Sequence, residues 1–514
     1  MYLTKIFHYK KNAITKLFVF CLSIIILVFC SHPKVNKKKE VVLASVGNEK
    51  ITVSDFRRNY EFGLPNLKVE PNRKLSYLQY MIYEKVLSLE GYKLGLNNSP
   101  RVKDLENDLL NELLIEELFI KNVNSKIVVK PEEVKQAILK SQVSWKMNYW
   151  FESNIEQAKF IRSEIIKNGF EKTIGKILKS NPELKFKLND FETNYVTWLE
   201  IAPDVLDKIK NLSINQISEP IKLGKGYFLF QIKDIRRSGT TDFDLKNKYE
   251  TFRQILYYRK LKKEAGKYVS SIMQPKNVIT KGKALHELTT EFIAWKQDTL
   301  KQTFKDFVEK NNIELLNKPL VKFEKHIWRV SDFIKKFNTK RIKTTSLSKT
   351  KIAGEISKQI ALEVRNNELV KLALKNNLDK NEHLKKQLKE WRDKWVYEEA
   401  RKYFLKKTKI TDKEAKDFFQ NNITSFQVNA KEIPKYKEYK NTAKKFAYIK
   451  KAEKILLTRI DSLKKIYPIH INKEILDTIQ TIDFQKSRWQ SLQVFKRSSN
   501  RLAVPIVDPA WKIK

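Results

Sequence analysis

Cysteine is almost absent from this chain of 514 residues, and its only two, Cys21 and Cys30, both lie near the start. The long remainder therefore cannot form a structural disulfide, a cysteine-ligated zinc site or a catalytic thiol. A body without cysteine suits an exported protein in an oxidising compartment. Glycine and proline are also scarce, at 12 and 14 residues. Lysine, glutamate, leucine and isoleucine abound instead, which favours helices.

Acidic residues are too few to balance the basic ones, and the formal net charge is +43. One interpretation is a nucleic-acid or anionic-membrane partner. The other is a lysine-rich composition, typical of an AT-rich genome, with the lysines on solvated helix faces. The lysines are spread evenly and no nucleic-acid-binding motif stands out, so we expect no nucleic-acid partner. Hydrophobic residues make up 41% of the chain, enough for packed cores, and the length allows about two to four domains.

The N-terminus has the pattern of an export signal. Several lysines precede an apolar run from Leu17 to Phe29, which is shorter than the about 20 residues of a membrane span. The run ends in Leu27-Val28-Phe29-Cys30, which resembles a bacterial lipobox, although Phe29 replaces the usual small residue. We expect residues 1–30 to be a signal with lipid attachment at Cys30, and residues 31–40 to be a tether. The alternative is that Cys30 is an ordinary signal-peptide residue.

The next stretch predicts a hairpin followed by helices. Val41–Val46 and Ile51–Val53 are expected to be strands around a turn, with Ser54 capping a helix that starts at Asp55. Amphipathic patterns and a proline at a helix start predict three further helices, over residues 73–94, 104–122 and from 131 onward.

Residues 141–237 change to a mixed pattern. Val143–Phe151 is expected to be a strand that places Trp145, Met147, Tyr149 and Phe151 on one face. A helix over 155–168 follows. The stretch 212–235 predicts a short strand over 217–221, a tight connection at Gly224 and a second strand from Gly226. A long helix over 242–271 and a strand over 277–280 come next.

Two motifs in these stretches resemble known families. Ile217-Ser218-Glu219-Pro220-Ile221 followed by Gly226-Tyr227 resembles the end of a parvulin-type (PpiC-type) peptidyl-prolyl isomerase domain. The opening Val-Gly-x-x-x-Ile-Thr-x-Ser-Asp-Phe resembles SurA- and PrsA-type periplasmic foldases. This likeness covers roughly residues 41–280. It implies an α+β parvulin-like domain over 141–237, inserted into a helical foldase core.

The resemblance also shows what is missing. The family has one catalytic histidine in its first strand, at Asn148 or Tyr149 here, and a second after Gly-Tyr, where this chain has Phe228. No histidine or cysteine occurs from Ser141 to Arg237. Parvulins lower a barrier of ~18–20 kcal/mol to rotation about one C–N bond, using an apolar proline pocket beside those two histidines. We therefore assign no catalytic residue, and expect no cofactor or metal.

The second half is similar to the first. Trp328–Phe333 matches Ile51–Phe56, and helices over 352–374, 384–404 and 443–466 precede a strand at 468–471. We expect a mainly α protein with two helical modules, the first interrupted by the parvulin-like domain; the alternative is chance likeness between lysine-rich helices. The first module would comprise 41–140 with 238–280, and the second 318–420 with 421–472. Residues 281–317 would be a helical linker. Residues 473–514, with a strand-like stretch at 502–507, are unassigned.

Two functions compete. The first is an exported, lipid-anchored chaperone at the cell envelope that binds unfolded envelope proteins and uses the altered domain for binding. The second is an active, divergent isomerase. A cytosolic nucleic-acid binder is a third class, against which the apolar leader argues. Five aromatic residues could line a pocket for an apolar or proline-containing segment, with plain core packing as the alternative for each: Trp145, Tyr149, Trp198, Phe228 and Phe230.

Overall fold

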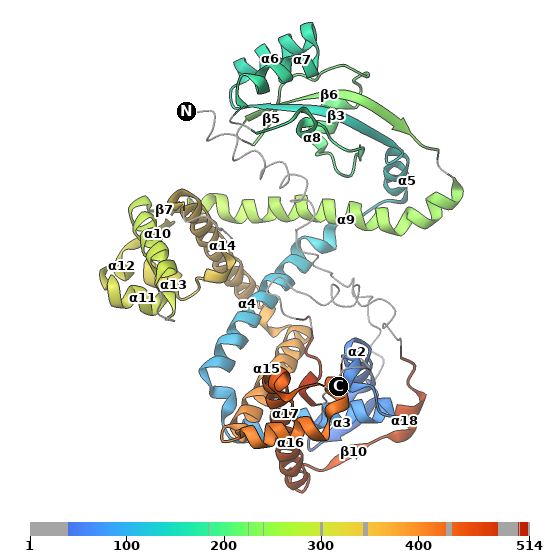
Figure 1. The fold of residues 1–514 in the computed structure, drawn as a ribbon, viewed down its shortest axis with the longest axis vertical. Coiled ribbons are helices and arrows are strands. Elements are labelled where there is room, and N and C mark those ends of the chain that lie inside the picture. The colour runs from blue at the N-terminus through green and yellow to red at the C-terminus, as the bar shows by residue number, and fades with distance from the viewer. Residues whose placement is uncertain are drawn as a thin grey trace. The chain divides into compact units, whose positions relative to one another are not determined.

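The computed structural model (Figure 1) describes residues 40–511 apart from 183–184, 225, 240, 299–301, 343–347, 428–433, 482–501 and 503. The predicted signal, tether and Cys30 lie outside the described residues. The described chain forms two compact units. One runs from Ile120 to Lys276, and the other combines the residues up to Phe119 with those from Asn277 onward. The long helix α4 (Pro100–Asn122) crosses the boundary between them.

The first unit is built on a four-stranded antiparallel sheet in the order β4-β3-β6-β5. The two long central strands, β3 and β6, pair along almost their whole length, from Val143 opposite Arg237 to Glu152 opposite Tyr227. Figure 1 shows α6 and α7 on one side of this sheet and α8 on the other. The bounds are β3 Val143–Glu152, α6 Ile155–Asn168, α7 Phe170–Lys179, β4 Val196–Thr197, α8 Pro203–Ile209, β5 Ile221–Leu223 and β6 Gly226–Arg237.

Two helices flank the sheet in sequence and pack together. Helix α5 (Pro131–Lys140) precedes it and α9 (Asp242–Met273) follows it. Lys260 of α9 joins the start of α5, donating to Glu133 at 2.7 Å and to the Val128 carbonyl at 2.6 Å. The predicted α+β domain is thus confirmed, and its neighbouring helices hold its two chain ends together.

One strand in this domain differs from the sequence-based prediction. The expected strand over 217–221 is limited to an isolated bridge between Ile217 and Gln231, and the regular strand begins only at Ile221. The reason is that Ser218, with 1% of its surface exposed, turns its side chain back to the sheet. Its hydroxyl accepts a hydrogen bond from the Phe230 amide at 3.1 Å. Gly224 has φ +62°, the left-handed conformation that its turn requires.

The second unit contains two similar hairpin-and-helix arrangements. The hairpin β1 (Val42–Val46) and β2 (Glu49–Thr52) leads into α2 (Val53–Phe62), and β8 (Pro319–Phe323) and β9 (His326–Arg329) lead into α13 (Val330–Ile334). Thr52 and not Ser54 caps α2, because its hydroxyl accepts from the Asp55 amide at 3.1 Å while the Asp55 carboxylate accepts from the Thr52 amide. Phe56 and Phe333 occupy matching positions and are fully buried.

The long helices also follow in the same order. α3 and α4 have their counterparts in α14 and α15, and a residue with positive φ separates each pair: Gly95 at +72° and Asn377 at +54°. α17 is followed by a strand, as α9 is. The bounds of α3, α14 and α15 are close to those predicted from the apolar periodicity, whereas α17 begins before the predicted residue 443. The bounds are α3 Arg73–Lys93, α14 Lys349–Lys375, α15 Glu382–Leu405, α16 Asp412–Asn421 and α17 Tyr436–Leu463.

The strand pairing, however, exchanges the last strands of the two predicted modules. β10 (Ile469–Ile471), expected in the second module, pairs with β1, with Ala44 opposite Ile471. β7 (Ile279–Thr280), expected in the first module, pairs with β8. The predicted composition of each module is therefore wrong: each hairpin is completed by the strand that lies at the end of the other half. The predicted linker also takes part, because α10 (Gly282–Gln297) packs against α14 and β8.

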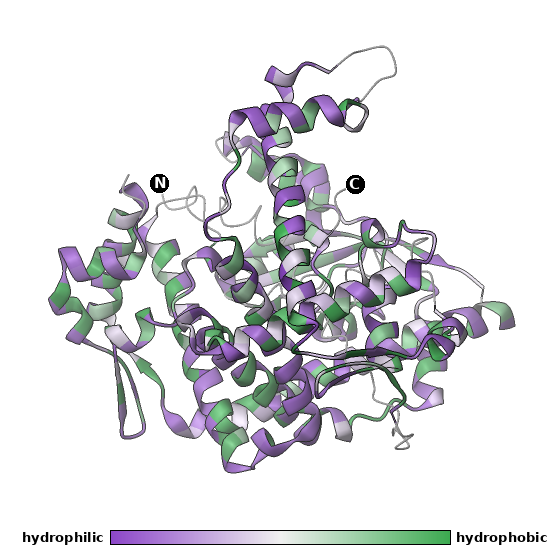
Figure 2. Cartoon of the chain, turned by 90° about the horizontal axis from the view of Figure 1, so that it is seen from below, coloured by the Kyte–Doolittle hydropathy of each residue, from purple (hydrophilic) through white to green (hydrophobic). Residues whose placement is uncertain are grey.

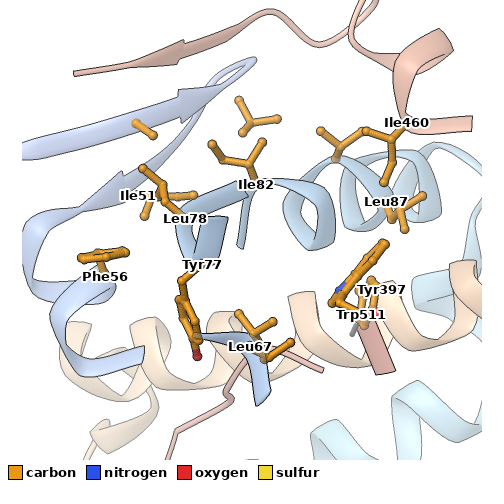
Figure 3. Close-up of a cluster of buried hydrophobic side chains, with 14 of the residues drawn as sticks. Ile51, Phe56, Leu67, Tyr77, Leu78, Ile82, Leu87, Tyr397, Ile460 and Trp511 are labelled. Carbon is orange, nitrogen blue, oxygen red and sulfur yellow. The ribbon is translucent and has the colours of Figure 1, made fainter. Parts of the chain in front are cut away.

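The largest core of the second unit reflects this exchange. Buried residues of β1, β2, α2 and α3 meet buried residues of α15 and α17 (Figure 3). α3 and α15 approach closely at Gly91, where an added Cβ would lie 2.6 Å from Val396 and 3.3 Å from Ala400. Figure 2 shows that hydrophobic and hydrophilic residues alternate along the helices. Among the described helices, none has the length and hydropathy needed to cross a membrane.

Candidate functional site

Four aromatic side chains form one face of the sheet in the first unit. In an antiparallel pair, directly opposed residues point to the same side. Tyr149 lies opposite Phe230 and Phe151 opposite Phe228, so all four share a side. The Phe151 and Phe228 rings are 5.0 Å apart edge to face, and Phe228 and Phe230 are stacked at 6.0 Å. We call these four residues the aromatic face. Its three phenylalanines are half-buried, which leaves part of each ring accessible.

Tyr149 anchors the buried end of the aromatic face. Its hydroxyl donates to the Asp190 carbonyl at 2.6 Å, and its ring meets Phe191 edge to face at 6.0 Å. Burial raises the pKa of Tyr149 to about 12, with a smaller contribution from Asp190. The phenol therefore stays protonated near neutral pH and remains a donor to this carbonyl.

Gly226 allows Phe151 to close the exposed end. A Cβ at Gly226 would lie 2.4 Å from the Phe151 ring and 2.6 Å from the Glu152 carbonyl oxygen, so no larger residue fits without moving the backbone. The Gly-Tyr pair that begins β6 thus has a steric role here. It lets the Phe151 ring lie across the strand and contact Phe228.

The structure brings together three of the five predicted pocket residues, namely Tyr149, Phe228 and Phe230. Trp145 lies on the same strand, in a buried cluster against α8 on which Phe230 also packs. Trp198 belongs to a third cluster, with α5 and Phe252 of α9. Its indole donates to the Ala137 carbonyl at 2.9 Å, and the Arg259 guanidinium lies 4.3 Å from the ring. These contacts make Trp198 a packing residue and do not place it on the aromatic face.

Phe151 and not Trp198 completes the site. Strand alternation had already placed Phe151 on the same face as Tyr149, but its contact with Phe228 depends on the register between two strands that are distant in sequence. Ile221 of β5, opposite Phe228 and 8% exposed, extends the apolar surface in the same way.

The two positions that the sequence resemblance assigned to the family histidines do not face each other. Phe228 lies opposite Phe151, two residues beyond Tyr149. Asn148, the alternative first position, is buried and donates from its side-chain amide to Gln231 at 3.2 Å. Because neighbouring residues of a strand point to opposite sides, Asn148 and Gln231 lie on the other side of the sheet from the aromatic face.

Charged residues also pair around the sheet. Glu192 accepts from Lys146 at 2.5 Å and also from Lys233, and these hydrogen bonds hold the pKa of its carboxyl below the usual value. On the other side, Arg162 donates to the Ser218 carbonyl at 3.1 Å and pairs with Glu219 at 2.7 Å. The aromatic face itself consists of ring faces and one phenol, which suits an apolar chain segment.

Comparison with known families identifies this part of the chain. Residues 152–245 match the family model described as the PPIC-type PPIASE domain. The match runs from the end of β3 into α9 and includes Phe228. β3 itself precedes it but pairs along β6, so it is physically part of the same domain. The chain thus carries a PPIC-type peptidyl-prolyl isomerase domain, which confirms the resemblance seen in its sequence.

Several solved structures are similar to the chain at low identity. Peptidylprolyl isomerase PrsA from Bacillus anthracis is 15% identical, with 37% of this chain and 96% of that chain covered and a TM-score of 0.22. PrsA from Bacillus cereus is 16% identical, with 53% of this chain and 99% of that chain covered and a TM-score of 0.23. A SurA-like chaperone from Campylobacter jejuni is 16% identical, with 47% of this chain and 100% of that chain covered and a TM-score of 0.22. TM-scores this low do not define a common arrangement of the whole chain. No curated protein matches the sequence.

Proposed function

We propose that this protein is a chaperone of the cell envelope that binds unfolded proteins, and that its PPIC-type domain serves binding while its isomerase activity is weak or lost. The observation that carries the proposal is the aromatic face. At the second family histidine position it has Phe228, which is packed between Phe151 and Phe230 and still partly accessible. Half-buried aromatic rings bind exposed apolar or proline-containing segments without a specific sequence.

An active, divergent isomerase is the second candidate. The family match over residues 152–245 favours it, because the domain fold is retained around the sheet. The absence of histidine and cysteine from Ser141 to Arg237 argues against it. An apolar surface that holds a proline-containing segment is common to both candidates, so binding alone does not separate them, whereas turnover does.

Phe228→Asp is expected to weaken binding of an unfolded, aggregation-prone client by roughly tenfold, equivalent to about 1.4 kcal/mol. The reason is that a carboxylate at this half-buried position must keep its water and so disfavours an apolar ligand. The measurement is light scattering of the client at increasing concentrations of the full chain, together with the affinity for a labelled unfolded client.

Two variants serve as controls for that comparison. Phe228→Leu keeps an apolar side chain and should retain most of the binding. Ser153→Asp adds the same charge at an exposed position just beyond β3 and should change little. Thermal melting of each variant verifies that the domain is folded at the assay temperature. Equal client binding by wild type and Phe228→Asp would remove the aromatic face from the binding function.

We also propose that the chain is exported and held to a membrane through Cys30. The support is the basic start, the apolar run from Leu17 to Phe29 and the lipobox-like Leu27–Cys30. Stable attachment needs more than one acyl chain. The mature protein from membranes is expected to begin at an acylated Cys30 in mass spectrometry; a mature N-terminus that retains Met1 or lacks the lipid would contradict this.

A further inference from the structure

The C-terminal segment crosses the helical core of the second unit like a bound peptide. We define it as Val504–Trp511. Its first residues, through Asp508, are in neither helix nor strand, and Pro509–Trp511 form a 3-10 turn. Val507 and Trp511 have only 1% and 2% of their surface exposed. An isolated extended segment with two deeply buried side chains resembles a ligand in a groove more than an element of the helical packing.

One asparagine side chain forms hydrogen bonds with the backbone of this segment. The Asn59 side chain in α2 donates to the Pro505 carbonyl at 3.1 Å and accepts from the Val507 amide at 3.1 Å. The Tyr77 hydroxyl donates to the same Asn59 oxygen at 2.8 Å and so fixes the amide group. Two hydrogen bonds to residues two apart recognise an extended backbone whatever its side chains are. Asn66 adds a third contact, to the Pro509 carbonyl at 3.2 Å.

Trp511 fills an aromatic cage. Its ring is stacked on Tyr80 and on Tyr397, with 6.2 Å between ring centres in both cases, and lies 5.7 Å from Tyr83. Figure 3 shows Trp511 beside Tyr397 and below Leu87 in this cluster. The indole donates to Glu84 at 3.3 Å. The cage thus combines ring surfaces with one acceptor, which together suit an indole.

Asp508 is recognised by charge and hydrogen bonding. Its carboxylate accepts from the Tyr397 hydroxyl at 3.0 Å and from Arg401 at 3.2 Å. Its amide donates to Glu84 at 2.6 Å, and Glu84 in turn is held by Lys394 at 2.7 Å. Burial raises the pKa of Glu84, and the ion pair with Lys394 opposes that effect. The groove therefore supplies partners for both the carboxylate and the amide of Asp508.

The groove is larger than its occupant. A cavity of about 810 Å³ continues beside the segment, lined by Leu64, Trp391, Leu405 and Tyr448 together with Pro505 and Pro509 of the segment. Cavities of roughly 300–1,000 Å³ are typical of ligand sites. Space of this size next to an extended segment leaves room for a longer or bulkier peptide along the same path.

We propose that this groove is a peptide-binding site, that the chain's own C-terminal segment is its resident occupant, and that an extended segment of an unfolded protein can replace it. The groove would select an apolar residue, an acidic residue next to it and a tryptophan three positions further on, as in Val507, Asp508 and Trp511. The groove and the aromatic face are different sites. An experiment that contradicts peptide binding at one of them therefore does not contradict it at the other.

The test uses the full chain with a protease site placed between residues 485 and 498. After folding and cleavage, a fluorescent peptide of residues 501–514 should exchange with the released segment, and its anisotropy should rise. It should bind the uncleaved protein at least tenfold more weakly, because the resident segment competes at high local concentration. Asn59→Ala in the cleaved protein, and Trp511→Ala in the peptide, should each reduce binding severalfold.

Trp511→Ala in the uncleaved full chain is the second arm. It should leave the core folded by circular dichroism and open the groove to the labelled wild-type peptide, with affinity raised at least tenfold. A core that melts when the segment is released or when Trp511 is truncated would make the segment an integral part of the fold and overturn the proposal. So would a folded, cleaved protein that fails to exchange its segment for the labelled peptide.

Discussion

A chain that ends at Asn317 is expected to lose the cooperative fold of its N-terminal hairpin and of α2 and α3. In the exchanged arrangement, the core beside α3 is completed by α15, α17 and β10, all of which come after Asn317. The first module predicted from the sequence alone would be intact in this truncated chain. The truncation therefore separates the two arrangements by the largest effect that we expect.

The size of the effect follows from the buried side chains that the truncation removes. They include Leu456, Ile460 and Leu463 of α17, each no more than 1% exposed. Burial of one large apolar side chain contributes about 1.5–3 kcal/mol, whereas a domain is stable by only about 5–15 kcal/mol in total. Loss of several such residues exceeds the whole stability of this core.

Circular dichroism and thermal melting of the truncated chain are the measurement. We expect no cooperative transition from the helical part, and restoration of helix when a separate chain of residues 318–514 is co-expressed. The PPIC-type domain lies in the other unit and provides an internal control that should keep its own transition. A truncated chain with a stable, cooperatively melting helical module of residues 41–119 would contradict the exchange.

The strand pairing can also be examined by paired cysteines. With Cys21 and Cys30 replaced, the chain has no other cysteine. Ala44→Cys with Ile471→Cys places two thiols on directly opposed residues of β1 and β10 and should form a disulfide. The matched control is Ala44→Cys with Ile279→Cys, which lies in the strand that the sequence assigned to the first module; this pair should remain reduced.

The exchange shows which part of the fold local sequence could not predict. The first hairpin, the helices after it and the repeat of this order in the second half were visible as short-range patterns. The strands at 279–280 and 469–471 look alike locally, because each is short and follows a long helix and a proline, Pro275 or Pro468. Either strand can pair with either hairpin edge by backbone hydrogen bonds that carry no side-chain information, so the choice depends on long-range packing.

The candidate site was predictable to a similar extent. Period-two alternation placed Tyr149 and Phe151 on one face, and the Gly-Tyr motif located Phe228. The register that puts Phe151 opposite Phe228 was not visible in either strand alone. Trp198 was misplaced because an aromatic residue in a turn can pack on either side, and here α5 and α9 cover it. The C-terminal segment is too short for any periodicity to reveal its groove.

The second large effect concerns catalysis. The full chain is expected to leave a proline-limited refolding step at its uncatalysed rate, which takes tens to hundreds of seconds at 25 °C. On the aromatic face, the Tyr149 phenol is already bound to the Asp190 carbonyl, and Phe151, Phe228 and Phe230 offer no proton or charge to the rotating amide. Asn148, on the opposite side of the sheet, is bound to Gln231. The face can hold a proline-containing segment but has no pair of imidazoles to assist rotation.

The most direct measurement follows the refolding of one proline-limited client and the aggregation of the same client, both with the full chain and with Phe228→Asp. The account predicts that the wild-type chain suppresses aggregation while the slow refolding phase is not accelerated, and that Phe228→Asp reduces only the first effect. Acceleration of the slow phase by a catalytic amount of the wild-type chain would contradict it and establish an active isomerase.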